Sequence, residues 1–298
     1  MKKEALKLLA IVLVVTVAGL WVTYRFLPIK HDLTLATGER YQGTMKDGRY
    51  HGRGLLTYAP GNIRVSYEGE FVNGLRHGQG TMIWKNGTVY VGQWRDGITH
   101  GRGFYTYPAD DPHLSYEGEL DDGECHGQGT MIWKNGQKYE GQWRNHLVDG
   151  RGVATFAPDD SRLSYTGEFE SGQLHGQGEM IWKNGTRYKG QWRNGRSDGH
   201  GSIVWEYGAA YEGQWRDDKP NGRGIMTYPP NYDRGRVSYE GEFRNSEPEG
   251  TGVMIWKDGR KSEGTWKGGE LYYGVEYDAA GRELFRTVDG QKRNAAER

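Results

Sequence analysis

The feature of this chain that most constrains its fold is internal repetition. Residues 67–115 return almost unchanged as residues 116–164, and each copy contains the phrase Tyr-x-Gly-x twice, followed by an aromatic residue or, at Leu120, by leucine. A short fixed period is typical of a repeat array, in which each unit packs mainly against its neighbours. The alternating spacings of 23 and 26 residues are set by the tyrosines that open the phrase, Tyr67, Tyr90, Tyr116, Tyr139, Tyr165 and Tyr188.

Each unit has the residue pattern of a β-hairpin. Alternation along Tyr90–Trp94 places an aromatic residue, a glycine and an aromatic residue on one strand face, and Gly78, Gly80, Met82 and Trp84 share a face in the preceding run. Asn86-Gly87 between these runs is a strong signal for a two-residue hairpin turn. A glycine inside a strand normally weakens it, unless another group lies close over the backbone. We therefore predict a single-layer sheet whose rings lie on glycines of adjacent strands, with structural roles for Gly78, Gly80, Gly92, Gly141 and Gly190.

The phrase Tyr-x-Gly-x-Trp-x-x-Gly-x-x-His-Gly-x-Gly, as in Tyr90–Gly103, resembles the MORN repeat. The resemblance extends over Tyr41–Trp266, in about ten units. It implies an all-β repeat array, an elongated single-layer antiparallel sheet of tandem hairpins. It also implies a non-catalytic role in scaffolding, dimerisation or organisation at membranes, and lipid binding has been proposed for the family.

Two kinds of connection alternate along the array. Tight Asn-Gly or Asp-Gly turns, as at Asn86-Gly87, alternate with longer proline-containing connections, as at Pro108–Pro112, and both are expected on one rim. The Gly-x-x-His-Gly turns are expected on the other rim. The alternation breaks around Ser197–Tyr211, where two short units run together, and this predicts a local change of twist.

The N-terminal segment, residues 1–30, differs from the repeats. Leu8–Tyr24 is uncharged and apolar over a length near the lower limit for a membrane span, with Lys2, Lys3 and Lys7 before it. We expect one uncleaved transmembrane signal-anchor helix, because the apolar run exceeds the usual signal-peptide core and no good cleavage site follows; a cleaved signal peptide is the alternative. The charge pattern favours a cytoplasmic N-terminus. The expectation is a single-pass protein of a bacterial inner membrane with its repeats in the periplasm, and repeats facing the cytoplasm are the alternative.

The rest of the chain divides by pattern. We expect a linker over 31–40, the repeat array over 41–270, a hairpin over 271–290 that caps the open sheet edge, and a disordered tail over 291–298. The terminal units are degenerate, with Met45 and Ser262 in aromatic positions, because a terminal repeat lacks one neighbour.

The composition excludes several classes of site. Zero net charge argues against a nucleic-acid binder. A single cysteine, Cys125, rules out an internal disulfide and a cysteine-built zinc site, and is expected at an ordinary variable position, with an intermolecular disulfide or a reactive thiol as alternatives. Histidines such as His77 and His100 recur at one repeat position, but equivalent positions lie two strands, about 9.6 Å, apart. We expect them to bond locally to backbone, and we expect no metal, cofactor or catalytic residue.

The paired acids Asp110-Asp111 and Asp159-Asp160 are expected to form exposed turns, with weak cation binding as the alternative. The repeated aromatic residues remain as the candidate binding site, because one layer is not expected to cover both sides of every ring, and exposed apolar patches usually mark binding. The groove candidates are Tyr58, Trp84, Tyr90, Tyr107, Trp133, Tyr139, Trp182, Tyr188 and Trp256.

Three functions follow from these features. The first is a membrane-anchored scaffold that holds a protein partner, or a second copy of the chain, along the aromatic groove. The second is glycan or cell-wall binding through the tryptophans. The third is direct lipid binding by the repeats, which ranks lower because the basic residues are scattered among acids.

Overall fold

The computed structural model describes residues 31–230 and 235–294. The predicted membrane anchor, residues 1–30, lies outside the described residues. Within the described ranges, no helix has the length and apolar character needed to cross a membrane.

The described chain consists of strands and the turns between them. The strands are β1 (His31–Thr34), β2 (Arg40–Lys46), β3 (Arg49–Thr57), β4 (Arg64–Val72), β5 (Leu75–Trp84), β6 (Val89–Arg95), β7 (Ile98–Thr106), β8 (His113–Asp121), β9 (Glu124–Trp133), β10 (Lys138–Arg144), β11 (Leu147–Thr155), β12 (Arg162–Glu170), β13 (Gln173–Trp182), β14 (Arg187–Arg193), β15 (Arg196–Val204), β16 (Ala210–Arg216), β17 (Lys219–Thr227), β18 (Arg236–Arg244), β19 (Glu247–Trp256), β20 (Lys261–Lys267), β21 (Glu270–Tyr277), β22 (Glu283–Val288) and β23 (Gln291–Asn294).

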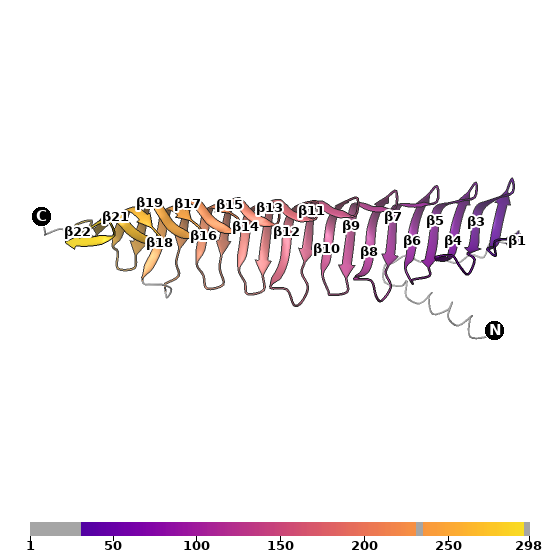
Figure 1. Cartoon of the computed structure of the whole chain (residues 1–298), viewed down its shortest axis with the longest axis horizontal. Coiled ribbons are helices and arrows are strands. Elements are labelled where there is room, and N and C mark those ends of the chain that lie inside the picture. Colours follow the sequence, from indigo (N-terminus) through magenta and orange to yellow (C-terminus); the bar gives the residue numbers. More distant parts are fainter. Residues whose placement is uncertain (1–30, 231–234, 295–298) are drawn as a thin grey trace.

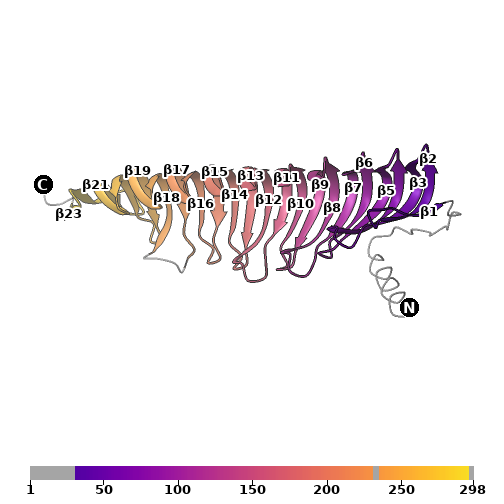
Figure 2. The same cartoon turned by 45° about the vertical axis from the view of Figure 1, so that its right-hand side comes forward.

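The strands form one antiparallel sheet of 23 strands, in which each strand pairs with the next along the chain. The sheet is a single open layer drawn out into a rod, with β1 and β22 toward opposite ends (Figure 1). The predicted all-β, single-layer antiparallel sheet of hairpins is therefore confirmed. The ribbon coils more tightly toward the C-terminal end, as the turned view also shows (Figure 2).

The two rims of the sheet carry different turns. Along one rim, here called the turn rim, two-residue turns have positive φ at both residues, as at Asp96 (50°) and Gly97 (87°). This conformation matches the right-handed twist of the flanking strands. The opposite rim, here called the loop rim, holds the longer connections and the Asn-Gly or Asp-Gly turns that follow a Trp-Lys pair, as at Asn86-Gly87.

The predicted two-residue turn at Asn86-Gly87 has a different form. Only Gly87 has a positive φ (95°), and the Trp84 N–H donates to the Thr88 carbonyl at 2.9 Å. The Gly87 N–H in turn donates to the Trp84 carbonyl at 3.0 Å, which makes this a three-residue connection ending in a left-handed glycine. The tightest turns of the fold are the Asp-Gly and Asn-Gly pairs on the turn rim.

The core lies on one face of the sheet, here called the aromatic face. Each unit places its opening tyrosine over a pair of facing glycines. A Cβ added at Gly103 would lie 2.5 Å from Cζ of Tyr90, and one added at Gly92 would lie 2.5 Å from the Gly103 Cα. Nine such tyrosines form the tyrosine ladder, at most 2 % exposed: Tyr41, Tyr67, Tyr90, Tyr116, Tyr139, Tyr165, Tyr188, Tyr211 and Tyr239.

Rings from neighbouring strands cover the sides of the ladder. Trp94 stands edge-on to both Tyr67 and Tyr90 at 5.3 Å between centroids, and the pattern continues through the buried Phe and Trp side chains of later units. Such T-shaped contacts are a preferred aromatic geometry. Each ladder hydroxyl donates to the carbonyl three residues onward, at 2.7–3.2 Å. A single layer thereby builds its own interior.

The first glycine of the His-Gly-x-Gly phrase has a different role. Gly101 has a positive φ (65°) at an irregularity in the pairing of β6 with β7, and the Gln93 amide oxygen accepts from the Arg102 N–H at 2.8 Å above it. Gly78 occupies the same position beneath the Glu70 carboxylate, with a φ of 57°. The expected ring over Gly78 is therefore replaced by a carboxylate, because the register shift between Gly69 and Glu70 interrupts the strand alternation.

Both ends of the sheet extend beyond the predicted array. His31–Thr34, expected in a linker, forms β1 against β2, and Gln291–Asn294, expected in a disordered tail, forms β23 against β22. The predicted C-terminal hairpin is present as β21 and β22, with Ala280-Gly281 in its turn. Backbone hydrogen bonds to the sheet edge order β1 and β23. Their side chains are mostly polar and show no strand pattern, so the sequence did not predict these strands.

A buried ion network replaces the ladder at the C-terminal end. Ser262 stands where other units have the ladder tyrosine, and the nearby Glu276 is 4 % exposed. The Glu276 carboxylate accepts hydrogen bonds from Arg260 at 2.9 Å, Lys292 at 3.1 Å and Ser262 at 3.2 Å. These partners compensate the desolvation of the charge.

Candidate functional site

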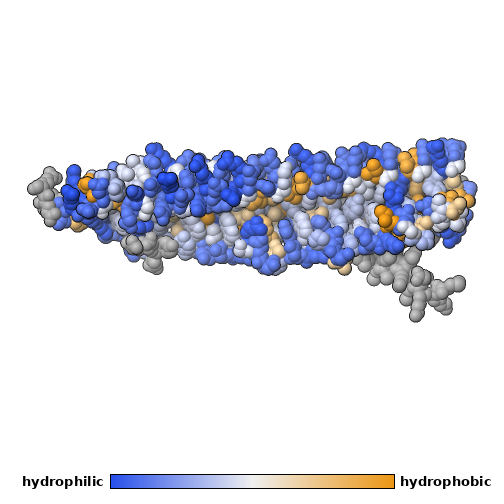
Figure 3. Space-filling view, in the orientation of Figure 1, coloured by the Kyte–Doolittle hydropathy of each residue, from blue (hydrophilic) through white to orange (hydrophobic). Residues whose placement is uncertain are grey.

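A row of aromatic side chains runs along the aromatic face beside the loop rim, and it is here called the rim row. Each member lies two residues beyond a core residue near the end of its strand, so that it projects on the same face as the tyrosine ladder. The members are Tyr58, Trp84, Tyr107, Trp133, Phe156, Trp182, Trp205, Tyr228 and Trp256. All except the buried Tyr58 are partly exposed. In Figure 3 pale and orange residues lie along the middle of the rod, between blue borders.

One predicted groove residue, Tyr58, belongs to the rim row but is buried, and the structure divides the other eight into two groups. Trp84, Trp133, Trp182, Trp256 and Tyr107 are partly exposed members of the rim row. The predicted contact residues Tyr90, Tyr139 and Tyr188 instead belong to the tyrosine ladder and are at most 2 % exposed. They offer no surface to a partner, because glycine backbone lies beneath them and edge-on rings cover their sides.

Burial also changes the chemistry of the ladder phenols. Burial raises the pKa of Tyr139 and of Tyr211 to about 12 in each case, and it raises the pKa of the other ladder tyrosines as well. A phenol removed from water favours its neutral form. These tyrosines therefore serve as neutral core residues at physiological pH.

Side chains that can carry positive charge accompany the rim row. The register places Arg64 opposite Trp84, His113 opposite Trp133, Arg162 opposite Trp182 and Arg236 opposite Trp256. Each also follows a rim-row ring of the preceding strand across the long connection: the Arg64 guanidinium lies 5.6 Å from the Tyr58 centroid, and that of Arg162 lies 4.0 Å from Phe156. The sequence carries a signal for this arrangement, a basic residue or histidine 20 positions before each of these four tryptophans, which alternation within a single strand does not reveal.

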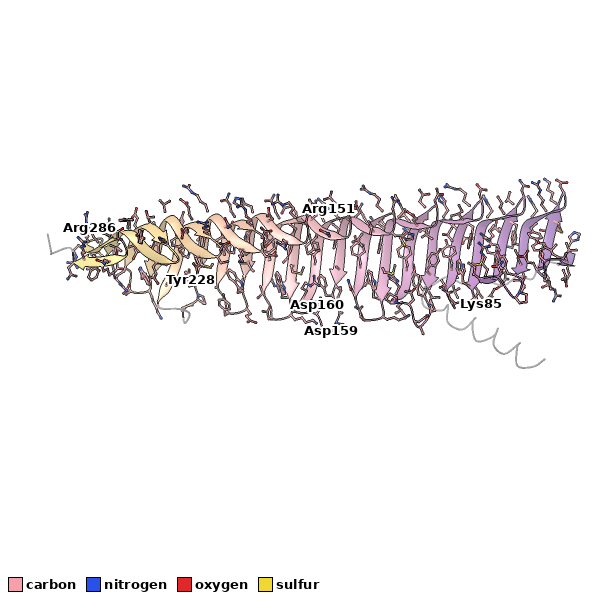
Figure 4. The ribbon with its side chains drawn as sticks, in the orientation of Figure 1. Lys85, Arg151, Asp159, Asp160, Tyr228 and Arg286 are labelled. Atoms are coloured by element: carbon pink, nitrogen blue, oxygen red, sulfur yellow. The ribbon has the colours of Figure 1, made fainter. Side chains whose placement is uncertain are left out.

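The basic residues that follow the tryptophans hold the long connections in place. Lys183 donates through Nζ to the Pro158 carbonyl at 2.6 Å, and Lys85, Lys134 and Lys257 likewise reach the long connection of the preceding unit. Lys85, Asp159 and Asp160 lie at the loop rim in Figure 4, whereas Arg151 projects from the opposite rim and Tyr228 lies toward the loop side.

The paired acids belong to these connections. Asp160 accepts from both the backbone and the guanidinium of Arg162, at 2.8 and 2.7 Å, and these hydrogen bonds lower the pKa of Asp160 to about 2. Asp111 accepts from His113 in the same manner at 2.8 Å. Their carboxylates thus shape the turns, as Asp side chains commonly do.

Three of the recurring histidines, His77, His100 and His175, lie beside carboxylates, and for these the contact takes the place of the expected local bond to backbone. His100 Nδ1 is 3.0 Å from Asp121, and His175 Nδ1 is 3.2 Å from Glu170. His100, Asp121 and Asp122 are the one group of potential metal ligands found within residues 31–230 and 235–294. Arg95 lies 2.9 Å from His100 Nε2 and within 3.7 Å of both acids, so a guanidinium already occupies this cluster.

Cys125 is 4 % exposed within the core, at the position of Arg76 and Leu174 in other units. Burial raises the pKa of its thiol to about 11. A buried thiol of high pKa is a small apolar core residue, consistent with the expected ordinary variable position.

Comparison with solved structures finds chains of low similarity. The TCP10 domain of Danio rerio CPAP in complex with a peptide of Danio rerio STIL is 16% identical, covering 87% of this chain and 98% of that chain at a TM-score of 0.33. The SAS-4 (dCPAP) TCP domain of Drosophila melanogaster, in complex with a proline-rich motif of Ana2 (dSTIL), is 13% identical, covering 62% and 77% at a TM-score of 0.24. Similarity at this level supports no inference about function. No curated protein sequence matches the chain.

A family model matches most of the array. The MORN repeat model matches nine segments, which are residues 41–63, 67–89, 90–111, 116–138, 139–161, 165–187, 188–206, 211–231 and 239–259. The degenerate unit that opens at Ser262, counted among the expected units, is not matched. MORN repeats suggest a binding or scaffolding role that is based on the repeats. The chain belongs to the MORN-repeat family.

Proposed function

We propose that this protein is a non-catalytic scaffold that binds a protein partner along the rim row. The observation that carries the proposal is the continuity of the row: partly exposed rings recur on one face from β5 to β19, on a sheet whose own core is already complete. These rings therefore exceed what the interior requires. Exposed aromatic residues in a row suit an extended peptide or a helix of a partner protein, since aromatic residues dominate protein interfaces.

Charge beside the rings supports a protein partner. Arg64 and Arg162 bring guanidinium groups to the same surface as Trp84 and Trp182. Aromatic residues and arginine are the residue types enriched at protein interfaces, and the mixture offers both apolar contact and hydrogen bonding. A second copy of the chain is the other protein occupant that this surface fits.

The N-terminal segment adds a tether to this proposal. Residues 1–30 combine a basic start with an apolar run of membrane-spanning length. We propose that this segment anchors the protein in a bacterial inner membrane with the repeats in the periplasm. Fusion of a reporter active only in the periplasm to the C-terminus tests the orientation, and a reporter active only in the cytoplasm would show the opposite one.

Photocrosslinking in native membranes tests partner binding. A photoreactive residue at Trp133 is expected to capture a discrete protein, identified by mass spectrometry. The matched control carries the same photoreactive residue at Lys189, which is exposed on the opposite face of β14. Equal capture at both positions, or none at Trp133, would contradict the proposal.

Two further binding experiments test a glycan and a lipid as alternative ligands. Retention of residues 31–298 on insoluble polysaccharide, lost in Trp133→Ala, would identify a glycan as the ligand of the rim row. Flotation of residues 31–298 with anionic liposomes would identify lipid binding by the repeats themselves. A captured protein at Trp133 without either activity is the expected result.

A further inference from the structure

Two turns in the middle of the turn rim carry an internal ion pair. In each, an arginine directly follows the last core ring of its strand, so that it projects from the polar face, which is the face opposite the aromatic face. The next strand supplies a carboxylate five residues later. Arg144 lies 2.8 Å from Asp149 in this way, and Arg193 lies 2.8 Å from Asp198. The chain itself therefore neutralises these two arginines.

The pairing stops at the next turn of this rim, between β16 and β17. Arg216 follows Trp215 as Arg193 follows Trp192, and the strands pair in the same register around both turns. The position of the carboxylate is occupied by Asn221, which carries no charge. In the part of the chain that the structure describes, the guanidinium of Arg216 has no hydrogen bond, ion pair or ring contact.

Two more basic residues lie at the following turns. Arg244 has a carboxylate five residues later, in Glu249, but this carboxylate accepts a hydrogen bond from the Gly268 N–H of the next turn at 3.0 Å. Among the described residues, the guanidinium of Arg244 is also unpaired. Lys267 has Tyr272 at the partner position, and its Nζ lies 5.1 Å from the centre of that ring. An aromatic ring does not neutralise the ammonium charge.

These three side chains are exposed and line one cleft of about 640 Å³, in the region where the ribbon coils tightly (Figure 1). They are here called the basic cluster: Arg216, Arg244 and Lys267. The acids that line the same cleft are engaged within the fold, because Glu242 accepts from the Thr251 hydroxyl at 2.7 Å and Glu249 accepts from a backbone N–H. The positive charges of the cluster remain available to a ligand.

The earlier turns indicate the ligand. Arginine at this turn position binds a carboxylate at Asp149 and at Asp198, and the guanidinium fork matches a carboxylate in geometry and charge. We propose that the basic cluster binds the carboxylates of an acidic segment of a partner protein. One of these carboxylates takes the place beside Arg216 that Asp198 occupies beside Arg193.

The spacing of the cluster describes the segment. Successive turns of one rim are two strands, or about 9.6 Å, apart. A polyproline II segment presents every third residue on one side, about 9.3 Å apart, so acidic residues three positions apart match successive basic residues. The carboxylates of Glu242 and Glu249 disfavour a phosphate group, which carries up to about two negative charges. This surface lies on the opposite face and the opposite rim from the rim row, so the inference does not depend on the proposed partner binding there.

Fluorescence anisotropy with two synthetic peptides tests the proposal. The full chain in neutral detergent micelles is titrated into a labelled peptide of repeated Glu-Pro-Pro triplets, and a peptide of repeated Gln-Pro-Pro triplets is the uncharged control. We expect the glutamate peptide to bind saturably and to bind more weakly as salt is added. The glutamine peptide should not bind.

The deciding variant restores the pairing of the earlier turns. Asn221→Asp gives Arg216 an internal carboxylate, and it is expected to fold and to weaken binding of the glutamate peptide about threefold. The double variant Arg216→Gln with Arg244→Gln should weaken binding about tenfold. Arg193→Gln is the matched control, because Arg193 is already paired with Asp198, and it should leave binding unchanged. Circular dichroism checks that each variant folds.

Several outcomes would overturn the proposal. These are equal binding of the two peptides, unchanged binding in Asn221→Asp, or an equal loss in Arg193→Gln. Displacement of the glutamate peptide by inorganic phosphate at matched ionic strength, or flotation with anionic liposomes that is lost in the double variant, would identify a phosphate site instead. Capture of a protein at Trp133 should be unchanged in the double variant, so the two proposals fail separately.

Discussion

The substitution Gly152→Ala tests the packing of tyrosine rings on glycine. An added Cβ would lie 2.6 Å from both Cε2 and Cζ of Tyr139, well inside the 3.5–4.0 Å at which carbon atoms make favourable contact. Gly152 does not have a positive φ, so the expected effect comes from crowding and not from backbone strain.

The magnitude follows from two contributions. Forcing an extra carbon into a well-packed core typically costs about 1–3 kcal/mol. Displacing the ring also breaks the hydrogen bond from the Tyr139 hydroxyl to the Gln142 carbonyl, 2.9 Å long, which contributes about 0.5–1.5 kcal/mol. We expect Gly152→Ala to lower the free energy of unfolding by about 2–4 kcal/mol.

Urea unfolding, followed with hydrogen exchange of β9 to β12, measures the effect. Gly61→Ala is the matched control, because no atom lies within 4 Å of its added Cβ and its φ is not positive; its effect should stay within about 0.5 kcal/mol. The double variant with Tyr139→Ala should be less destabilised than the sum of the single variants by about 1 kcal/mol or more. Equal stability of Gly152→Ala and the parent, or strict additivity with Tyr139→Ala, would refute the account of rings on glycines.

Two pH effects follow from the buried groups. Burial raises the pKa of Tyr139 and of Tyr211 to about 12. The contribution of these phenols to the free energy of unfolding is therefore complete below their ordinary pKa of about 10 and is lost as the pH rises toward 12. Phenolate absorbance should rise together with loss of the β-sheet circular dichroism signal, and ionisation of the phenols within an intact sheet would contradict this. Burial raises the pKa of Glu276, but hydrogen bonds from Lys292 and Arg260 lower it more, so its pKa lies below the ordinary 4.5. Its stabilisation is present above that value and is lost as the pH falls through the lowered pKa. Amides of β21 to β23 should then exchange first in acid, and Glu276→Gln should remove that acid dependence at the cost of faster exchange at neutral pH.

The repeat period predicted most of the architecture. Alternation around Gly92 and Gly141 predicted strands, and mid-strand glycines predicted that rings lie on backbone, because a missing side chain has few other uses inside a strand. The ends were harder to predict: β1 and β23 have polar sequences, and backbone pairing with an existing edge orders them.

The candidate site was predicted only in part. Trp84, Trp133 and Trp182 are partly exposed, as a contact residue must be, but Tyr90, which the sequence placed in the same group, is fully buried. Sequence alternation assigns a residue to a face and does not show what lies above it. Exposure depends on the rings that pack around a residue, which for Tyr90 are Trp94 of the same strand and Tyr105 of the adjacent strand.

The sequence alone determined the single-layer sheet, its period and its aromatic face, because those depend on local alternation and on glycine at fixed positions. Only the tertiary structure decided which rings form the interior and which remain accessible, since that depends on contacts between adjacent strands.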